Sequence, residues 1–193
     1  DIPYLSIIPN VTVMAPINGR ELSEMLKHTL HHAKGPTAIK YSRGEASSLY
    51  EDQFEELHYG KGQILKEGKE AVIIAVGNIF EEADKAEKIL KEEGYEIGLV
   101  NPRYIKPFDQ ELIMKLSQTY DKIMIVEDEP KLLKTMTDFL TLQEYDVEYA
   151  SDGNSALALF REKKTIVHIH DMVDMFRPAH KKCVLESCEN AAG

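Results

Sequence analysis

Three histidines at helical spacing are the first side chains in this chain whose types and positions could do chemistry. His28, His31 and His32 occupy positions i, i+3 and i+4, so they share one face of a predicted helix. Imidazole nitrogens are common ligands of zinc, but the pattern lacks the carboxylate of the HExxH signature. A metal site at these histidines is therefore not predicted.

A single arginine, Arg43, stands before Gly44 at the end of a predicted strand. A guanidinium held at a strand end offers a planar pair of donors that fits a phosphate group. From the residues alone, an arginine in this position is more often solvated or held in a surface ion pair. The two interpretations therefore stay open at this point.

The composition limits the partners that the chain can have. Its 193 residues carry a net charge of −10, which argues against a nucleic-acid or anionic-membrane surface, because such surfaces need clustered Lys and Arg. A hydrophobic fraction of 43% with 29% charged residues is typical of a soluble globular protein. No apolar run approaches the roughly 20 residues that span a bilayer. We therefore expect no nucleic-acid partner and no membrane partner.

The two cysteines, Cys183 and Cys188, lie near the carboxyl end with no Cys or His beside them at metal-ligand spacing. They are interpreted as reduced thiols without a special role, which fits a cytoplasmic location. The amino end has no basic-then-apolar leader. Because the chain begins with Asp1 rather than Met, we expect it to start inside a domain.

Strands and helices alternate through the first part of the chain. The apolar run 11–16 predicts a buried strand. Asn18 and Glu21 form a capping-box pattern at the start of the helix that follows. A second strand is predicted over 37–41. The apolar face of the helix is predicted to hold Leu22, Met25, Leu26 and Leu30.

Residues 45–59 are acidic and weakly patterned, which is typical of a linker between domains. The continuous apolar run 71–77 then indicates a parallel strand that is covered on both faces. Asn78 is predicted to cap the next helix and Gly94 to close it. The other predicted elements are an edge strand over 60–68, strands over 96–100 and 122–126, and a helix over 109–118.

Beyond residue 126 the alternation continues with helices over 130–140 and 156–162 and strands over 146–150 and 165–169. After Asp171 the pattern fades, so residues 172–193 are predicted to form an irregular tail. The whole order predicts an α/β fold with three layers and mainly parallel sheets.

Residues 1–128 resemble 1-deoxy-D-xylulose-5-phosphate synthase, a transketolase-like family. The resemblance is specific because the matching words keep their order over about two thirds of the chain. These words lie at 1–5, 8–10, 13–16, 35–44, 60–62, 101–109 and 126–128. It implies that 1–57 is the end of the pyrimidine-binding domain with its linker, and that 58–128 is the C-terminal domain.

The resemblance implies a homodimer that condenses pyruvate with glyceraldehyde 3-phosphate, using thiamine diphosphate and a magnesium ion, to supply isoprenoid and thiamine precursors. Arg43 matches the arginine of the family's Tyr-Pro-Arg-Gly turn, which contacts the substrate phosphate. Ser42 stands in place of the proline, which could loosen the turn. The family's cofactor-binding motifs match nothing in this chain, so we expect no catalytic residue here, no thiamine diphosphate binding, and no activity of the chain alone.

Residues 122–171 resemble part of a response-regulator receiver domain, which has a flavodoxin-like fold. This second resemblance implies that Glu127 and Asp128 hold a magnesium ion and that Asp171 accepts a phosphoryl group from a histidine kinase. The sequence departs from the family at His168 and His170, which stand where apolar residues are usual. The fourth and fifth strands of a receiver are absent.

Two alternatives remain for the carboxyl-terminal part. Residues 174–178, with Leu185 and 191–193, faintly resemble the last segment of the synthase family, which would make the receiver-like piece an insertion. The other alternative is that the chain is a recombined product that folds only in part. The function hypotheses are therefore a synthase fragment that is inactive alone, a phosphorelay receiver, and a chain without activity.

Overall fold

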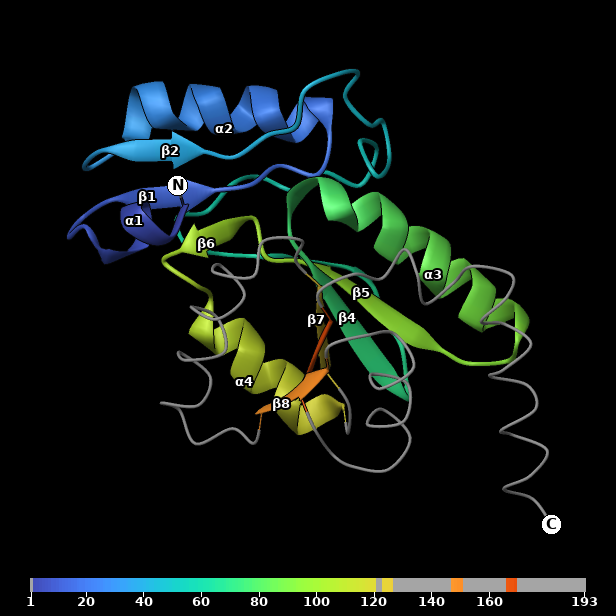
Figure 1. The fold of residues 1–193 in the computed structure, drawn as a ribbon. Coiled ribbons are helices and arrows are strands. Elements are labelled where there is room, and N and C mark those ends of the chain that lie inside the picture. The colour runs from blue at the N-terminus through green and yellow to red at the C-terminus, as the bar shows by residue number, and fades with distance from the viewer. Residues whose placement is uncertain (1, 121–122, 127–146, 151–165, 170–193) are drawn as a thin grey trace, which may run out of the picture.

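The computed structural model describes residues 2–120, 123–126, 147–150 and 166–169 (Figure 1). The helices predicted over 130–140 and 156–162, and the tail over 172–193, lie outside the described residues. In the described part, no helix is both long and apolar enough to cross a membrane.

Two sheets organise the fold. The smaller sheet has the order β2-β1-β6 and the larger has the order β3-β5-β4-β7-β9-β8. Neighbouring strands of the larger sheet are parallel except for β3, which is antiparallel to β5 at one edge. The strand bounds are β1 Thr12–Met14, β2 Thr37–Ile39, β3 Gln63–Lys66, β4 Ala71–Ala75, β5 Ile97–Asn101, β6 Tyr104–Lys106, β7 Ile123–Val126, β8 Val147–Ala150 and β9 Ile166–Ile169.

The helices cover both faces of the larger sheet, and Figure 1 shows α3 and α4 on its two sides. Alternate residues of β4 explain this arrangement, because successive side chains of a strand point to opposite faces. Ile74 packs with Ile113 of α4, whereas Ile73 packs with Phe80 of α3. The predicted α/β fold with three layers is confirmed. The helix bounds are α1 Ile2–Ile7, α2 Gly19–His32, a 3-10 turn η1 Gly77–Ile79, α3 Phe80–Glu92 and α4 Gln110–Thr119.

Strand β4 forms the centre of the larger sheet. All of its residues are buried, as the continuous apolar run predicted, and it pairs in parallel with β5 and β7. The helix predicted over 109–118 is also confirmed, because the Asp109 side chain accepts a hydrogen bond of 3.1 Å from the Leu112 N–H and caps α4. These elements were predictable because their signals are local.

Strand β6 was not predicted, and it joins the two halves of the described chain. It pairs antiparallel with β1, so residues 104–106 complete a sheet that begins near residue 12. Arg103 adopts a φ of 57°, a left-handed conformation that turns the chain from β5 into β6. The division between 1–57 and 58–128 remains a prediction, and the core of the molecule is continuous across it.

Helix α2 begins where the capping pattern predicted but buries a narrower face than expected. Asn18 caps it by accepting a hydrogen bond of 2.8 Å from the Glu21 N–H. Met25 is fully buried, but Leu26 is 50% and Leu30 81% exposed, so their predicted burial is wrong. The reason is that α2 rests on a sheet of three short strands, which covers a single stripe of its surface (Figure 1).

The predicted cap of the next helix is also wrong. Asn78 lies inside the 3-10 turn η1, and α3 starts after Ile79 without a side-chain cap. Gly77 has a φ of 63°, and this left-handed turn leads the chain into η1 before the helix begins. Gly94, with a φ of 96°, follows the end of α3 as predicted.

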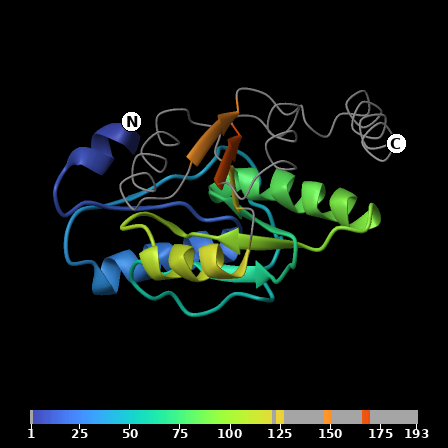
Figure 2. The ribbon, with the colours of Figure 1, turned by 90° about the horizontal axis from the view of Figure 1, so that it is seen from below.

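The strand order differs from that of a flavodoxin-like receiver. In that fold the first strand lies between the second and the third. Here β9 lies between β7 and β8, and Figure 2 shows β8 and β9 side by side. The flavodoxin-like arrangement predicted for 122–171 is therefore wrong for the described strands. The physical reason is that β4 already pairs with the other edge of β7.

Candidate functional site

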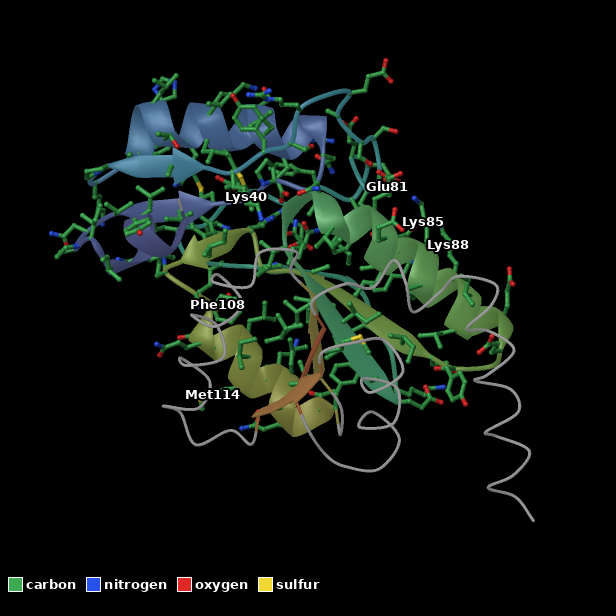
Figure 3. All side chains as sticks on the ribbon, viewed as in Figure 1. Lys40, Glu81, Lys85, Lys88, Phe108 and Met114 are labelled. Carbon is green, nitrogen blue, oxygen red and sulfur yellow. The ribbon has the colours of Figure 1, made fainter. Side chains whose placement is uncertain are left out.

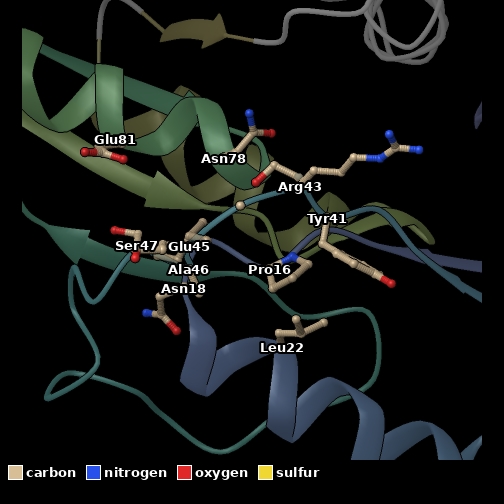
Figure 4. A pocket seen from close by; sticks show the side chains of 13 residues that line it. Pro16, Asn18, Leu22, Tyr41, Arg43, Glu45, Ala46, Ser47, Asn78 and Glu81 are labelled. Carbon is tan, nitrogen blue, oxygen red and sulfur yellow. The ribbon is translucent and has the colours of Figure 1, made fainter.

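A hollow of about 400 Å³ lies where the segment after β2 passes the start of α2 and the turn η1 (Figure 4). Residues 41–47 form one side of it and 16–18 another. Asn78 and Glu81 face it from η1 and α3. Three segments that are distant in sequence therefore meet at one concave surface, which is the usual shape of a small-molecule site.

Arg43 lies on the rim of this hollow with an exposed side chain. It makes no hydrogen bond and no ion pair to any other residue in the described part of the chain. Figure 4 shows its side chain extended along the rim on the side of Asn78 and away from Glu81. The described residues thus show a solvated arginine without a surface ion pair, and its role in phosphate binding remains a prediction.

The charges around the hollow are mixed. Glu45 and Glu81 bring carboxylates to its edge, and Arg43 is the cation that faces it. The Glu81 carboxylate lies 3.8 Å from the Lys85 ammonium, which offsets part of its charge (Figure 3 labels both on the outer side of α3). A small anion would therefore be attracted to the Arg43 end of the rim.

Hydrogen bonds from the start of α2 hold the floor of the hollow. The Asn18 side-chain amide donates to the Leu49 carbonyl at 2.7 Å, and the Gly19 N–H donates to the Ser47 carbonyl at 3.1 Å. The segment predicted as a linker therefore lies against α2 over its first residues. This contact fixes where the chain runs after Arg43.

Glu21 and Arg103 form a buried ion pair beneath this floor. Their side chains are each 2% exposed, and the Arg103 Nε donates to Glu21 Oε1 at 2.7 Å. Glu21 also accepts from the Ile17 N–H at 2.8 Å and from the Asn101 amide at 2.9 Å. Because Ile17 lines the hollow, the ion pair ties the floor of the hollow to the loop between β5 and β6.

The remaining donors of Arg103 are also used. Its Nη2 donates to the Gln63 side-chain oxygen at 2.5 Å and to the Glu55 carbonyl at 3.0 Å. Its guanidinium lies 5.1 Å from the centre of the Phe54 ring. The pairing of Arg103 with Glu21 was not predicted, because 82 positions separate the two residues and no local pattern links them.

A second buried cluster lies on α3. The Tyr50 hydroxyl donates to the Asp84 carboxylate, which also accepts from Lys66 at 3.1 Å and from Lys88 at 2.7 Å. Lys66 also pairs with Glu87. Burial and the hydrogen bond with Asp84 raise the pKa of Tyr50 to about 12. Burial alone would raise the pKa of Asp84, but its hydrogen bonds from Lys88, Tyr50 and Lys66 hold that pKa below its ordinary value of 3.8.

Asp84 is therefore expected to make folding depend on pH. Its pKa is lower in the folded than in the unfolded chain, so its stabilising contribution is present above an unfolded-state pKa of about 4 and is lost as the pH falls through the folded-state pKa. The difference in unfolding free energy between the wild type and Asp84→Asn should shrink between about pH 6 and about pH 2. Urea unfolding at a series of pH values measures it, and a constant difference would contradict this role.

The three histidines lie together on α2, where His31 and His32 are exposed and His28 is half-buried. The ring centres of His28 and His32 are 5.2 Å apart, and those of His31 and His32 are 6.2 Å apart. Burial, followed by the neighbouring charges of His32 and His58, lowers the pKa of His28. These side chains line a separate hollow, which Arg20 from the first turn of the helix also borders.

The described residues do not fit a magnesium–diphosphate seat. Such a seat needs several oxygen ligands around one ion. Nowhere in the described ranges do three or more His, Cys, Asp or Glu side chains come together in a way that could hold a metal ion. Glu127, Asp128 and Asp171 lie outside the described residues, so the magnesium site and the phosphoryl acceptor implied by the receiver resemblance remain predictions.

Comparison with known proteins finds similarity to transketolase-type enzymes. Residues 60–143 match the family described as "Transketolase, C-terminal domain". The 1-deoxy-D-xylulose-5-phosphate synthase of Crocosphaera subtropica is 38% identical over 130 residues, and that of Alkaliphilus oremlandii is 41% identical over 133 residues. These matches cover 66% and 68% of this chain but 20% and 21% of the relatives, so the chain spans about a fifth of their length.

Solved structures show the same fold. A split-gene transketolase, described as an inactive beta4 tetramer, has a TM-score of 0.63 at 22% identity, over 70% of this chain and 47% of the other. A transketolase mutant from Pichia stipitis has a TM-score of 0.50 at 21% identity, over 65% of this chain and 19% of the other. The chain thus has a transketolase C-terminal-domain-like fold and is homologous to the C-terminal region of 1-deoxy-D-xylulose-5-phosphate synthases.

Proposed function

We propose that this chain acts as the C-terminal region of a thiamine-diphosphate-dependent synthase that condenses pyruvate with glyceraldehyde 3-phosphate to give 1-deoxy-D-xylulose 5-phosphate. Its own contribution is to bind the phosphate group of glyceraldehyde 3-phosphate through Arg43. The homology to synthases from several bacteria supports this proposal. The proposal extends to a homodimeric assembly in the cytoplasm, as the resemblance implies.

The state of Arg43 is the observation that carries the proposal. The described part of the chain holds three arginines. Arg103 is buried in its ion pair with Glu21, and Arg20 donates to the Glu51 carbonyl at 2.7 Å. Arg43 alone among the three has an exposed guanidinium without a protein acceptor, and it borders a hollow large enough for a small phosphate ester.

The chemistry of the phosphate explains why this arginine suits it. A guanidinium presents two parallel N–H donors that match two phosphate oxygens. Binding at the rim would hold the phosphate end of the substrate and so orient its aldehyde end. In the parent family, thiamine diphosphate supplies the carbanion chemistry. The described residues include no group of three or more side chains that could hold a metal ion for it.

Removal of Arg43 should therefore weaken phosphate binding. We expect Arg43→Ala to raise the Kd for glyceraldehyde 3-phosphate about 10-fold to 100-fold, because a hydrogen bond to a charged group contributes about 1.5–3 kcal/mol. The Kd of Arg43→Lys should lie between those of the wild type and Arg43→Ala, since an ammonium keeps the charge but not the paired donors. Isothermal titration calorimetry with glyceraldehyde 3-phosphate and with inorganic phosphate measures both.

The matched control is Lys115→Ala, which removes one exposed cation on α4 at a distance from the hollow. It changes the net charge by the same amount as Arg43→Ala and should leave the Kd within about twofold of the wild type, because a distant surface charge is screened. Equal weakening by both variants would show that binding follows net charge alone. Unchanged binding by Arg43→Ala would likewise contradict the proposal.

A further inference from the structure

The second hollow, of about 350 Å³, lies between α2 and the segment near Phe54. His28, His31 and His32 line it together with Phe54 and Leu57. It shares no residue with the hollow beside Arg43, although residues along the length of α2, from Arg20 to His32, line it. The chemistry of the histidines here is therefore independent of the proposed phosphate site.

Two of the histidines have the geometry of a chelating pair. His28 and His32 are one helical turn apart on the same face, their ring centres are 5.2 Å apart, and their planes are tilted by 44°. Two imidazoles that hold one tetrahedral ion, with metal–nitrogen distances of about 2.0–2.1 Å, place their ring centres about 5 Å apart. The observed distance between the ring centres matches this value.

We infer that His28 and His32 chelate one divalent late transition-metal ion, such as Ni²⁺, Cu²⁺ or Zn²⁺, with solvent in the remaining coordination positions. Imidazole nitrogen suits all three ions. The described residues supply no third ligand, so this is a two-histidine site on a helix and not a closed structural centre. Affinity should follow the Irving–Williams order, with Cu²⁺ bound more tightly than Ni²⁺ or Zn²⁺.

The neighbouring groups explain why this pair and not another binds the ion. Glu24 lies one turn before His28 and lines the same hollow, but its carboxylate accepts a hydrogen bond from the Lys27 ammonium at 2.7 Å. His31 is adjacent to His32 in sequence, and its ring is turned by 60° from that of His32 at 6.2 Å. His28 and His32 are therefore the two protein ligands of the proposed ion.

Titration of the whole chain with NiCl₂, followed by calorimetry, tests the inference. The wild type should bind one Ni²⁺ at this site, and His28→Ala and His32→Ala should each weaken that binding by about tenfold or more, because loss of one ligand removes the chelate effect. His31→Ala is the matched control and should keep the Kd within about twofold of the wild type. The double variant His28→Ala/His32→Ala measures any binding by the other histidines and the two cysteines.

A second readout separates chelation from random surface binding. An ion that bridges i and i+4 binds the helical form of α2, so saturating Ni²⁺ should raise the melting temperature of the wild type and of His31→Ala, but not that of His28→Ala or His32→Ala. Far-UV circular dichroism confirms that each variant is folded. Equal weakening by His31→Ala, or unchanged binding in the double variant, would overturn the inference and leave the proposed phosphate site unaffected.

Discussion

Replacement of Arg103 with alanine is expected to lower the free energy of unfolding by about 3–5 kcal/mol, because it leaves a buried carboxylate without its cation. Glu21 is 2% exposed and lies at 2.7 Å from Arg103, so water cannot take the place of the lost guanidinium without opening the core. The same change removes the donors to Gln63 and Glu55. The hydrogen bonds from Asn101 to Glu21 would then be the remaining link between this region and α2.

Urea unfolding followed by circular dichroism measures this effect, and Arg20→Ala is the matched control. Arg20 is exposed and donates to a backbone carbonyl, so its loss should cost at most about 1 kcal/mol. The double variant Glu21→Met/Arg103→Met removes both charges. It should be more stable than Arg103→Ala, because removing both buried charges costs far less free energy than removing one of them. If Arg103→Ala behaves like Arg20→Ala, the buried pair does not hold these elements together.

Truncation of one side chain in the central strand should lower the free energy of unfolding by a comparable amount. Ile74→Ala is expected to lower the free energy of unfolding by about 2–5 kcal/mol, through lost burial and the cavity that remains. Ile74 is fully buried in β4, opposite Val100 of β5 and Ile125 of β7. These neighbours belong to rigid strands of the same sheet, so they cannot move far enough to fill the space.

The control for this variant is Leu30→Ala, which removes the same kind of side chain from an 81% exposed position on α2. Its effect should stay within about 0.5 kcal/mol, because little apolar surface is buried there. Both variants are compared by urea unfolding at one pH. A similar loss in the two would mean that the core does not lie around β4.

Elements with local sequence signals were predictable, and elements that depend on pairing between distant residues were not. Strand β4 and helix α4 were predictable because the pattern that indicates each of them lies within a few consecutive positions. Strand β6 was missed because Pro102 and Arg103 interrupt the pattern and because its partner, β1, lies far away in the sequence. The order of β9 beside β7 depends on pairing between distant strands, which no local pattern encodes.

The candidate site shows the same division. The place of Arg43 after a strand and before a turn was predictable from residues 37–44, and the structure puts this arginine on a hollow. The ion pair of Glu21 with Arg103, and the hydrogen bond of Tyr50 to Asp84, were not predicted. Each joins residues that become neighbours only after the sheets have formed.

An amide NMR titration with glyceraldehyde 3-phosphate tests the central claim most directly. In a ¹H–¹⁵N spectrum of the whole chain, the proposal predicts that the largest saturable shifts arise from residues 41–47 and from Asn78, which line the hollow with Arg43 (Figure 4). In Arg43→Ala these shifts should vanish at the same ligand concentration. Shifts that centre on another surface, or that persist in Arg43→Ala, would contradict the account.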